Sequence, residues 1–265
     1  DAMTIARPIL AATPRPSARR AIWALLLREV AATYGRSAGG YLWVVAEPVG
    51  AVVIMSVVLG HILRAPGLGQ DFPYFYASGY LPFAVFATLS AGLAQTLRTS
   101  APLLGLPAVT LADALIARFL LGIATQACIA AIVVTLVVLP MEHRPFLDWS
   151  ALCVGAAMLA SLGLSVGLAN CFLFAAFPIW ERIWAILNKP MFFVSGVMFV
   201  PEMVPARLRD IMMLNPVAHG IALVRRGFFA TYEAGHVVMA YPFLFSLAVG
   251  LPGVAFLLAR HKDLR

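Results

Sequence analysis

One short pattern in this sequence has the spacing of a catalytic motif. Residues 163–167 (GLSVG) match G-x-S-x-G, the turn that presents the nucleophilic serine of many hydrolases. That turn follows a strand and precedes a helix at the edge of a sheet, whereas this pattern lies in the middle of a long apolar run. The same residues match G-x-x-x-G, and small residues at this spacing let two helices approach closely within lipid. Helix packing is therefore favoured over catalysis here.

Other catalytic patterns are missing from the sequence. The chain has two lysines, Lys189 and Lys262, and neither follows a glycine, so there is no G-x-x-x-x-G-K-[ST] loop to cradle ATP phosphates. The five histidines show neither H-E-x-x-H nor another metal-ligand spacing. We therefore expect this chain to bind no cofactor and no metal ion by itself.

Polar residues inside the apolar runs are the remaining candidates for chemistry, because polar groups in lipid usually serve a function. They are Glu47, His61, Gln95, Gln126 and Asn170. No set of them forms a proton relay or an ion-coupling site, which disfavours a secondary transporter. A charge-poor interior instead favours a path for a large or amphiphilic substrate, with energy supplied from outside the chain.

The composition places most of the chain in lipid. Hydrophobic residues make up 62% of the 265 residues and charged residues 12%, against about 45–50% and about 25% in soluble domains. The mean hydropathy is +0.91. The formal net charge is +7, but the basic residues flank apolar runs, as in membrane proteins, so we expect no nucleic-acid partner.

Uncharged runs long enough to cross a bilayer predict an all-α integral membrane protein with six transmembrane helices. Residues 41–260 form a single transmembrane domain after a cytoplasmic N-terminus of residues 1–40. The fifth span is short of apolar residues, and Pro201 and Pro205 interrupt the helix after it. Re-entrant, broken or interfacial helices are therefore expected in region 202–236, between the fifth and sixth spans. The expected spans cover residues 41–63, 73–97, 119–141, 149–176, 183–201 and 237–259.

An amphipathic helix is expected at residues 19–33, ahead of the first span. Its apolar arc holds Ile22, Trp23, Leu26 and Val30, with Arg28 opposite. Such a helix lies along the headgroups, either as a simple anchor or as a lever joined to a cytoplasmic partner. Of the nineteen lysines and arginines, thirteen fall on the side that holds both termini, so both termini are expected in the cytoplasm.

Aromatic residues gather at the start of the second span and near the inner end of the fourth. They form either interfacial aromatic belts or parts of a pathway whose rings stack on sugars. The candidates for lining a substrate path are Trp43, Tyr80, Phe83, Phe172 and Trp184.

Four stretches carry a resemblance to a known family. They are residues 34–48 (YGRSAGGYLWVVAEP), 193–205 (FVSGVMFVPEMVP), 214–219 (LNPVAH) and 225–229 (RRGFF). Together they resemble the membrane subunits of type-2 ABC exporters for polysaccharides, most closely the capsular-polysaccharide permeases of the KpsM type. The resemblance covers nearly the whole chain. One departure is Gly39-Gly40, where Leu-Gly is commoner.

The resemblance implies a function and a set of partners. Two copies of the permease form a homodimer and pair with two copies of a separate P-loop ATPase, which holds the ATP and Mg. The substrate is a lipid-linked capsular polysaccharide. It crosses the bacterial inner membrane through a channel between the two permeases, towards a periplasmic adaptor and an outer-membrane exit.

The resemblance also assigns roles to residues. It places ATPase contacts on helix 19–33 and on cytoplasmic loops 98–118 and 178–189. It makes Glu47 and Pro48 a hinge at the inner gate. Basic residues after the fifth span are expected to face the periplasm and to contact acidic polysaccharide, lipid phosphates or the adaptor. The coupling candidates are Arg28, Arg98, Glu181 and Arg182, and the periplasmic basic candidates are Arg207, Arg209, Arg225 and Arg226.

Two alternatives remain open at this point. The first is an exporter of the same fold that moves O-antigen, teichoic acid or another amphiphile. The second is a membrane-bound glycosyl- or acyltransferase, which is disfavoured because no loop holds a D-x-D or a paired acid and histidine.

Overall fold

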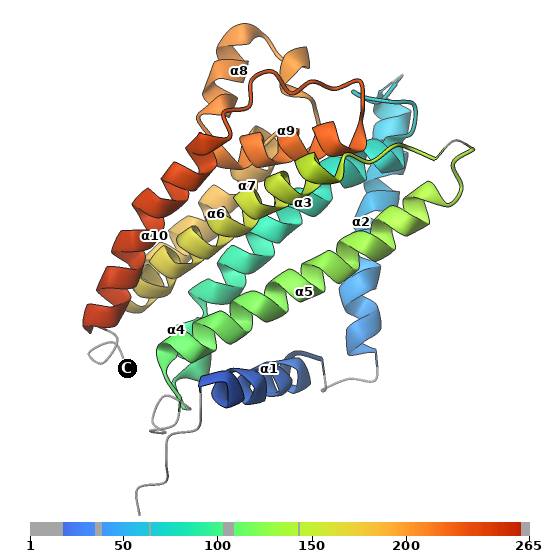
Figure 1. Cartoon of the computed structure of the whole chain (residues 1–265). Coiled ribbons are helices and arrows are strands. Elements are labelled where there is room, and N and C mark those ends of the chain that lie inside the picture. The colour runs from blue at the N-terminus through green and yellow to red at the C-terminus, as the bar shows by residue number, and fades with distance from the viewer. Residues whose placement is uncertain (1–17, 35–38, 64, 103–108, 143, 261–265) are drawn as a thin grey trace, which may run out of the picture.

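The described part of the chain is entirely helical. The computed structural model describes residues 18–34, 39–63, 65–102, 109–142 and 144–260. These residues form ten α-helices and one 3₁₀ turn and contain no strand (Figure 1). The prediction of an all-α membrane protein is confirmed. The helices are α1 (Ala18–Tyr34), α2 (Gly40–Ile62), α3 (Phe72–Ala94), α4 (Thr96–Ser100), α5 (Leu111–Val138), α6 (Trp149–Ala176), α7 (Pro178–Val194), α8 (Ala206–Met213), α9 (Pro216–Phe228) and α10 (Ala240–Arg260), with the 3₁₀ turn η1 at Pro201–Met203.

Five helices are long and apolar enough to cross a bilayer, namely α2, α3, α5, α6 and α10. Helix α7 has 17 residues, or about 25 Å at 1.5 Å per residue, and is not among them. It nevertheless runs antiparallel to α3. Its first turn contacts Gln95, just after the end of α3. Beyond its C-terminus, the carbonyl of Val197 lies against Gly79, near the start of α3.

Helix α7 therefore has other bounds than the range 183–201 expected for a fifth span. Helix α7 begins earlier because Pro178 at its first position needs no intrahelical N–H partner. It ends at Val194, followed by Gly196 in the left-handed region with φ of +75°. The expected loop 178–189 is consequently part of α7.

Helix α5 also begins before its predicted span of 119–141. The side chain of Thr110 accepts a hydrogen bond from the backbone N–H of Asp113, and the Asp113 side chain accepts one from the Thr110 backbone. This capping box starts the helix at Leu111. The expected cytoplasmic stretch 98–118 therefore includes the end of α4, which holds Arg98, and the start of α5, which holds Arg118.

The core is built on close contact between α3 and α6. A Cβ added at Gly163 would lie 2.8 Å from the Cβ of Leu89, and one at Gly167 would lie 2.7 Å from the Cβ of Leu93. The hydroxyl of Ser165 is buried and donates to the Leu162 carbonyl at 3.0 Å. The G-x-S-x-G pattern thus serves helix packing, as predicted.

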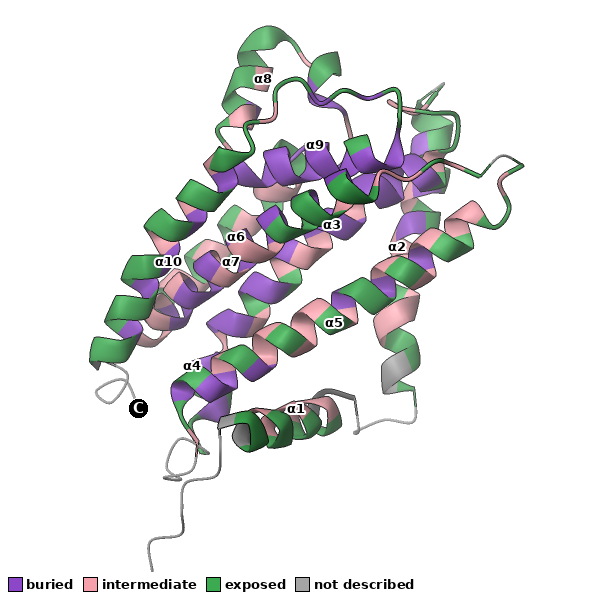
Figure 2. Ribbon diagram, viewed as in Figure 1, coloured by how far each residue is buried: buried purple, intermediate pink, exposed green. Residues whose placement is uncertain are grey.

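The region 202–236 is divided between an exposed helix and a buried one (Figure 2). Helix α8 is mostly exposed, whereas almost every residue of α9 is buried. Gly220 of α9 lies against Leu159 of α6, and Val224 lies against Gly155. Helix α9 therefore runs antiparallel to the first half of α6 and belongs to the bundle core rather than to its surface.

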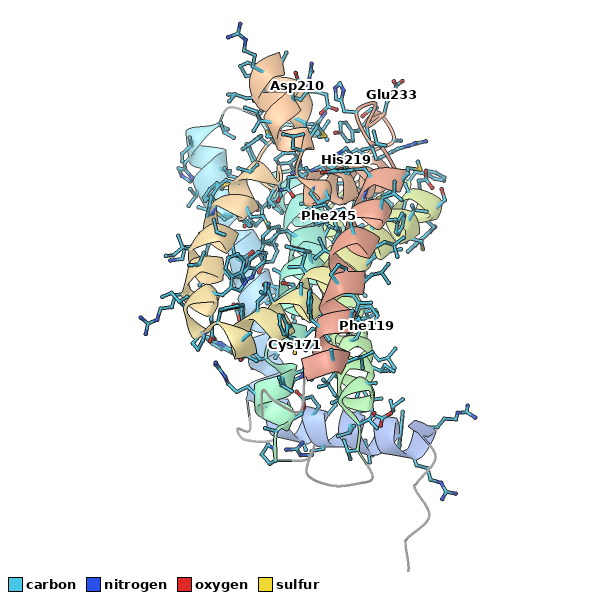
Figure 3. The ribbon with its side chains drawn as sticks, turned by 90° about the vertical axis from the view of Figure 1, so that its left-hand side faces the viewer. Phe119, Cys171, Asp210, His219, Glu233 and Phe245 are labelled. Carbon is cyan, nitrogen blue, oxygen red and sulfur yellow. The ribbon has the colours of Figure 1, made fainter. Side chains whose placement is uncertain are left out.

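The two ends of the bundle differ. Helix α1 lies across one end, and the last turn of α10 finishes near that same end (Figure 1). Helix α8 lies at the other end (Figure 1). A second view places Asp210 and Glu233 at the α8 end and Cys171 and Phe119 towards the α1 end (Figure 3). The first and last described helices thus lie at the same end of the bundle.

Candidate functional site

A polar junction joins α4 to α7 at the α1 end of the bundle. The carboxylate of Glu181 accepts a hydrogen bond from Gln95 Nε2 at 2.8 Å and one from Arg98 Nη1 at 3.0 Å. The bond from Gln95, followed by that from Arg98, lowers the pKa of Glu181. The carboxylate is therefore ionised at neutral pH, and one side chain of α7 is tied to both the end of α3 and the start of α4.

The predicted coupling residues fall into two groups. Arg98 and Glu181 pair with each other within the chain. Arg28 of α1 and Arg182 of α7 are exposed, and neither forms an ion pair with another described residue. Contact of these four residues with an ATPase stays a prediction, but the internal pair gives Arg98 and Glu181 a role that the sequence did not indicate.

A second junction, between α1, α3 and α5, was missed by the sequence analysis. Arg118 of α5 forms an ion pair with Glu29 of α1 and donates to the Gly92 carbonyl of α3 at 3.1 Å. The Arg118 and Glu29 side chains are only 14% and 25% exposed. The sequence feature that could have indicated this junction is Glu29, an acidic residue on the same helical face as the apolar residues Ile22 and Leu26.

Helices α2 and α7 are poorly covered within the single chain, and α5 and α10 are about as exposed as α2. No residue of α7 is fully buried. Trp43 of α2 is 72% exposed and Ile186 of α7 is 68% exposed. Glu47 is exposed in α2 and is followed by Pro48 inside the helix. The hinge role of Glu47 and Pro48 stays a prediction, and both residues lie on α2, which packs against α3 and α5.

The predicted path-lining aromatic residues do not form one surface. Trp184 is half-buried in α7, and Tyr80 stacks on Tyr76 with centroids 5.6 Å apart. Phe172 stacks on Phe256 of α10 at 5.2 Å. Phe83 is buried and packs edge-on against Phe192 at 5.1 Å. Phe83 is therefore a core residue of the single chain, and its place on a substrate path stays a prediction.

Arg225 also departs from its predicted place. It is 1% exposed, although it was expected to face the periplasm as a contact for substrate or adaptor. Its Nη1 donates to the carbonyls of Gly196 at 2.7 Å and Phe199 at 2.8 Å, and its Nη2 donates to the Val197 carbonyl at 2.6 Å. The guanidinium thus binds three backbone carbonyls of the turn that follows α7.

The other basic candidates remain at the surface of the α8 end. Arg207 and Arg226 are exposed, and Arg209 is half-exposed. Asp148 caps the start of α6 nearby, and hydrogen bonds from the Ser150 hydroxyl and the Ala151 N–H lower its pKa. Among the residues that the structure describes, no group of three His, Cys, Asp or Glu side chains could hold a metal ion.

A bundle with five helices long and apolar enough to cross a bilayer defines a multi-pass membrane protein. The chain belongs to the ABC-2 type transporter family, whose model matches residues 20–229. It is a membrane subunit of that family and not an enzyme by itself.

Curated relatives narrow the family further. The chain is 26% identical to the polysialic acid transport protein KpsM of Escherichia coli, over 90% of this chain and 93% of that protein. It is 28% identical to the capsule polysaccharide export inner-membrane protein CtrC of Neisseria meningitidis serogroup B, over 81% and 83%. Identity to the capsule polysaccharide export inner-membrane protein BexB of Haemophilus influenzae is 26%, over 81% and 83%.

Proposed function

We propose that this chain is the permease subunit of an ATP-driven exporter that moves lipid-linked capsular polysaccharide across the bacterial inner membrane. The observation that carries the proposal is the match to the ABC-2 type transporter family over residues 20–229, together with relatives named for capsule polysaccharide export. The sequence contains no P-loop, so ATP and Mg belong to a partner ATPase present in two copies.

The channel is formed by a homodimer in this proposal. We assign helices α2 and α7 as the dimer faces, and both leave large apolar side chains exposed, among them Trp43 and Ile186. Large exposed apolar surfaces mark sites of association or lipid contact. Trp43 and Glu47 of α2 and Trp184 of α7 lie on these two helices and are the side chains we assign to the path and its gate.

The α1 end is assigned to the cytoplasm. Its surface carries Arg28, Arg98 and Arg182, whereas acidic residues such as Glu202, Asp210 and Glu233 accompany the arginines of the α8 end. Cytoplasmic ends of membrane proteins carry an excess of Lys and Arg. Both termini are therefore cytoplasmic, and the ATPase docks against α1, α4 and the first turn of α7.

The junction at Glu181 then explains how an ATPase can move the channel. A displacement of α4 pulls Arg98 and Gln95, and both are bonded to Glu181 in the first turn of α7. Helix α7 has 17 residues and contains Pro190, so its turns before Pro190 act as the arm that receives the movement. Movement of α4 is thereby transferred to one of the two helices that face the channel.

Reversing the charge of Arg98 tests this transfer. In Arg98→Glu two carboxylates face each other, so α4 separates from α7. A surface ion pair contributes about 0–1 kcal/mol to stability, so the melting temperature should hardly change. Export per ATP hydrolysed should fall about fivefold or more, the usual size of coupling between sites.

The matched control restores the pair with opposite polarity. The double variant Arg98→Glu with Glu181→Arg should recover at least half of the lost export. Paired measurement of export and ATP hydrolysis in reconstituted complexes gives the ratio. Equal ratios of export to ATP hydrolysis in the wild type and in Arg98→Glu would show that the Arg98–Glu181 pair does not couple the two.

At the α8 end the exporter meets its substrate and a periplasmic adaptor. Arg207, Arg209 and Arg226 lie at that end with surface accessible to solvent. Their charge suits contact with an acidic polysaccharide, with lipid phosphates or with an acidic adaptor surface. Arg225 is not part of this set, because its guanidinium is occupied by backbone carbonyls.

Complementation tests the proposed substrate class. The chain and its cognate ATPase are expressed in a strain that lacks its own capsule permease and ATPase, and in a second strain that lacks the corresponding O-antigen exporter subunits. Surface capsule in the first strain and no surface O-antigen in the second is the expected result. O-antigen restored without capsule would overturn the assignment to capsular polysaccharide.

A further inference from the structure

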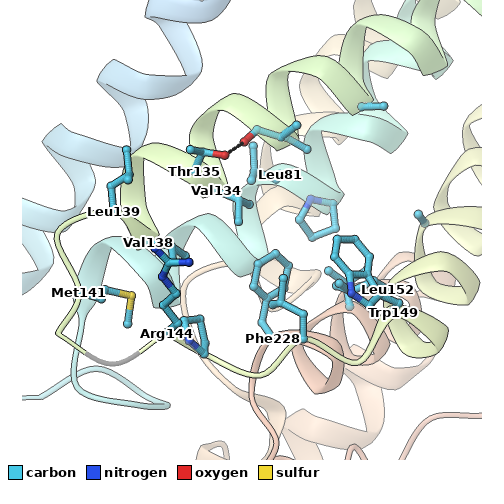
Figure 4. Close-up of a pocket in the computed structure, with 18 of the residues that line it drawn as sticks. Leu81, Val134, Thr135, Val138, Leu139, Met141, Arg144, Trp149, Leu152 and Phe228 are labelled. Carbon is cyan, nitrogen blue, oxygen red and sulfur yellow. Dashed lines mark hydrogen bonds between the residues drawn. The ribbon is translucent and has the colours of Figure 1, made fainter.

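A groove lies between α5 and α6 on the outside of the bundle. Helix α5 packs on α3 but scarcely touches α6, so α3 forms the floor of the space between them. The groove has a volume of about 810 Å³ (Figure 4). This lies within the range of about 300–1,000 Å³ typical of small-molecule sites.

The walls of the groove are apolar. Leu81 of α3, Val134 and Val138 of α5, Leu152 of α6 and Phe228 of α9 line it (Figure 4). The Thr135 hydroxyl on the α5 wall donates to the Ala131 carbonyl at 2.7 Å, so its donor is already used. The walls therefore suit a hydrocarbon chain and present few hydrogen-bonding groups to water.

The mouth of the groove carries charge. Arg144, Glu142 and Trp149 line it near the loop that joins α5 to α6. Arg144 is exposed and forms no ion pair within the described residues, although Glu142 is close in sequence. Trp149 is 68% exposed, as is typical of a residue at the headgroup level. An arginine beside a hydrocarbon slot at that level is suited to a phosphate.

The length of the groove matches one leaflet. Along α5 it extends from Ala127 to Leu139, which is about 18 Å at 1.5 Å per residue. Half of the hydrocarbon core of a bilayer is about 15 Å thick. A chain that enters at Arg144 would therefore end near the middle of the membrane.

We infer that this groove binds an acyl chain of a membrane phospholipid, whose phosphate is bonded by Arg144. The lipid belongs to the leaflet remote from α1. This site is separate from α2 and α7, to which the export path is assigned. The bound chain fills the space between α5 and α6 and so supports the outer half of the bundle where α9 packs against α6.

Photo-labelling tests the site directly. The complex of this chain with its ATPase is placed in phosphatidylglycerol vesicles that contain a phospholipid with a diazirine in its acyl chain, and adducts are mapped by peptide mass spectrometry. The wild type should concentrate adducts on residues 127–139 and 149–156. Filling the groove with Ala127→Phe and Ala131→Phe should reduce those adducts about tenfold.

Matched variants separate the groove from general lipid exposure. Ala124 is exposed one turn before the groove and does not line it, so Ala124→Phe should leave the adducts unchanged. Arg144→Gln lies outside the spans and removes only the phosphate contact. It should lower the adducts about tenfold by loss of a charge-assisted hydrogen bond.

Three results would overturn the inference. The first is equal labelling of the wild type and the groove-filled variant. The second is a partner's transmembrane helix cross-linked at residues 127–139 in place of lipid. The third is displacement of the photo-lipid by an equimolar lipid-linked polysaccharide, which would make the groove part of the substrate path.

Discussion

Replacing Arg225 by methionine is expected to abolish export and to lower the free energy of unfolding by about 3 kcal/mol or more. The guanidinium makes three hydrogen bonds to backbone carbonyls, at 2.6–2.8 Å, and lies 4.6 Å from the centre of the Phe75 ring. Methionine has a similar length but no donor, so three carbonyls lose their partner. Each buried polar group left without a partner costs about 1–3 kcal/mol.

The loss of export follows from the position of the turn that Arg225 holds. Gly196, Val197 and Phe199 directly follow α7, and Arg225 fixes them to α9. Without this contact the outer end of α7 keeps only weaker ties to the core, such as the hydrogen bond from Asn215 to Ser195. A displacement that enters α7 at Glu181 would then not reach the outer end of the channel.

Arg226 provides the matched control for this prediction. It is the next residue in the same helix but is exposed, so Arg226→Met should leave the melting temperature within about 1 °C of the wild type. Arg225→Lys keeps the charge, but an ammonium group cannot bond three carbonyls as a planar guanidinium does. The melting temperature of Arg225→Lys should therefore lie between those of Arg225→Met and Arg226→Met. Thermal unfolding in detergent measures all three. Equal melting temperatures for the two methionine variants would contradict the buried role of Arg225.

Adding side chains at the contact between α3 and α6 is the second change with a large expected effect. In Gly163→Val with Gly167→Val, each new Cβ would meet a leucine Cβ at 2.7–2.8 Å, and a backbone carbonyl of α3 lies at 3.1 Å. Two of the most closely packed helices would have to move apart. Overpacking costs about 1–3 kcal/mol per site, so a loss of about 2–6 kcal/mol is expected.

A glycine with free space provides the control. A Cβ added at Gly50 of α2 would have no neighbour within 4 Å. Gly50→Val makes the same chemical change in a helix, so its effect on helix propensity can be subtracted. The yield of folded monodisperse protein and its unfolding temperature give the comparison. A double variant as stable as Gly50→Val would show that α3 and α6 are not packed as described.

The sequence predicts the bounds of a membrane span correctly where a capping residue directly precedes the apolar run. The predicted range 149–176 coincides with α6 because Asp148 caps its first turn. Helix α5 was placed too late because counting uncharged residues stops at Arg118. The capping pair of Thr110 and Asp113 was visible in the sequence and marks the true start.

The site residues could be predicted only in part, because pairing is a property of the folded chain. Glu181 and Arg98 were recognised as polar residues at one end of the bundle, yet 83 residues separate them in sequence. Arg225 and Arg226 are adjacent arginines that sequence cannot distinguish. One is buried and the other exposed because α9 packs against α6 and α3, with Arg225 bonded to the turn that follows α7.

The most direct test of the whole account is transport in a reconstituted system. Inverted vesicles carrying this chain and its ATPase receive lipid-linked capsular polysaccharide outside and ATP, and polymer protected inside the vesicles is measured. Protected polymer should accumulate only with both subunits and hydrolysable ATP, and should fall to background with Arg225→Met. Accumulation by this chain alone, or ATP hydrolysis by it without a partner, would contradict the account.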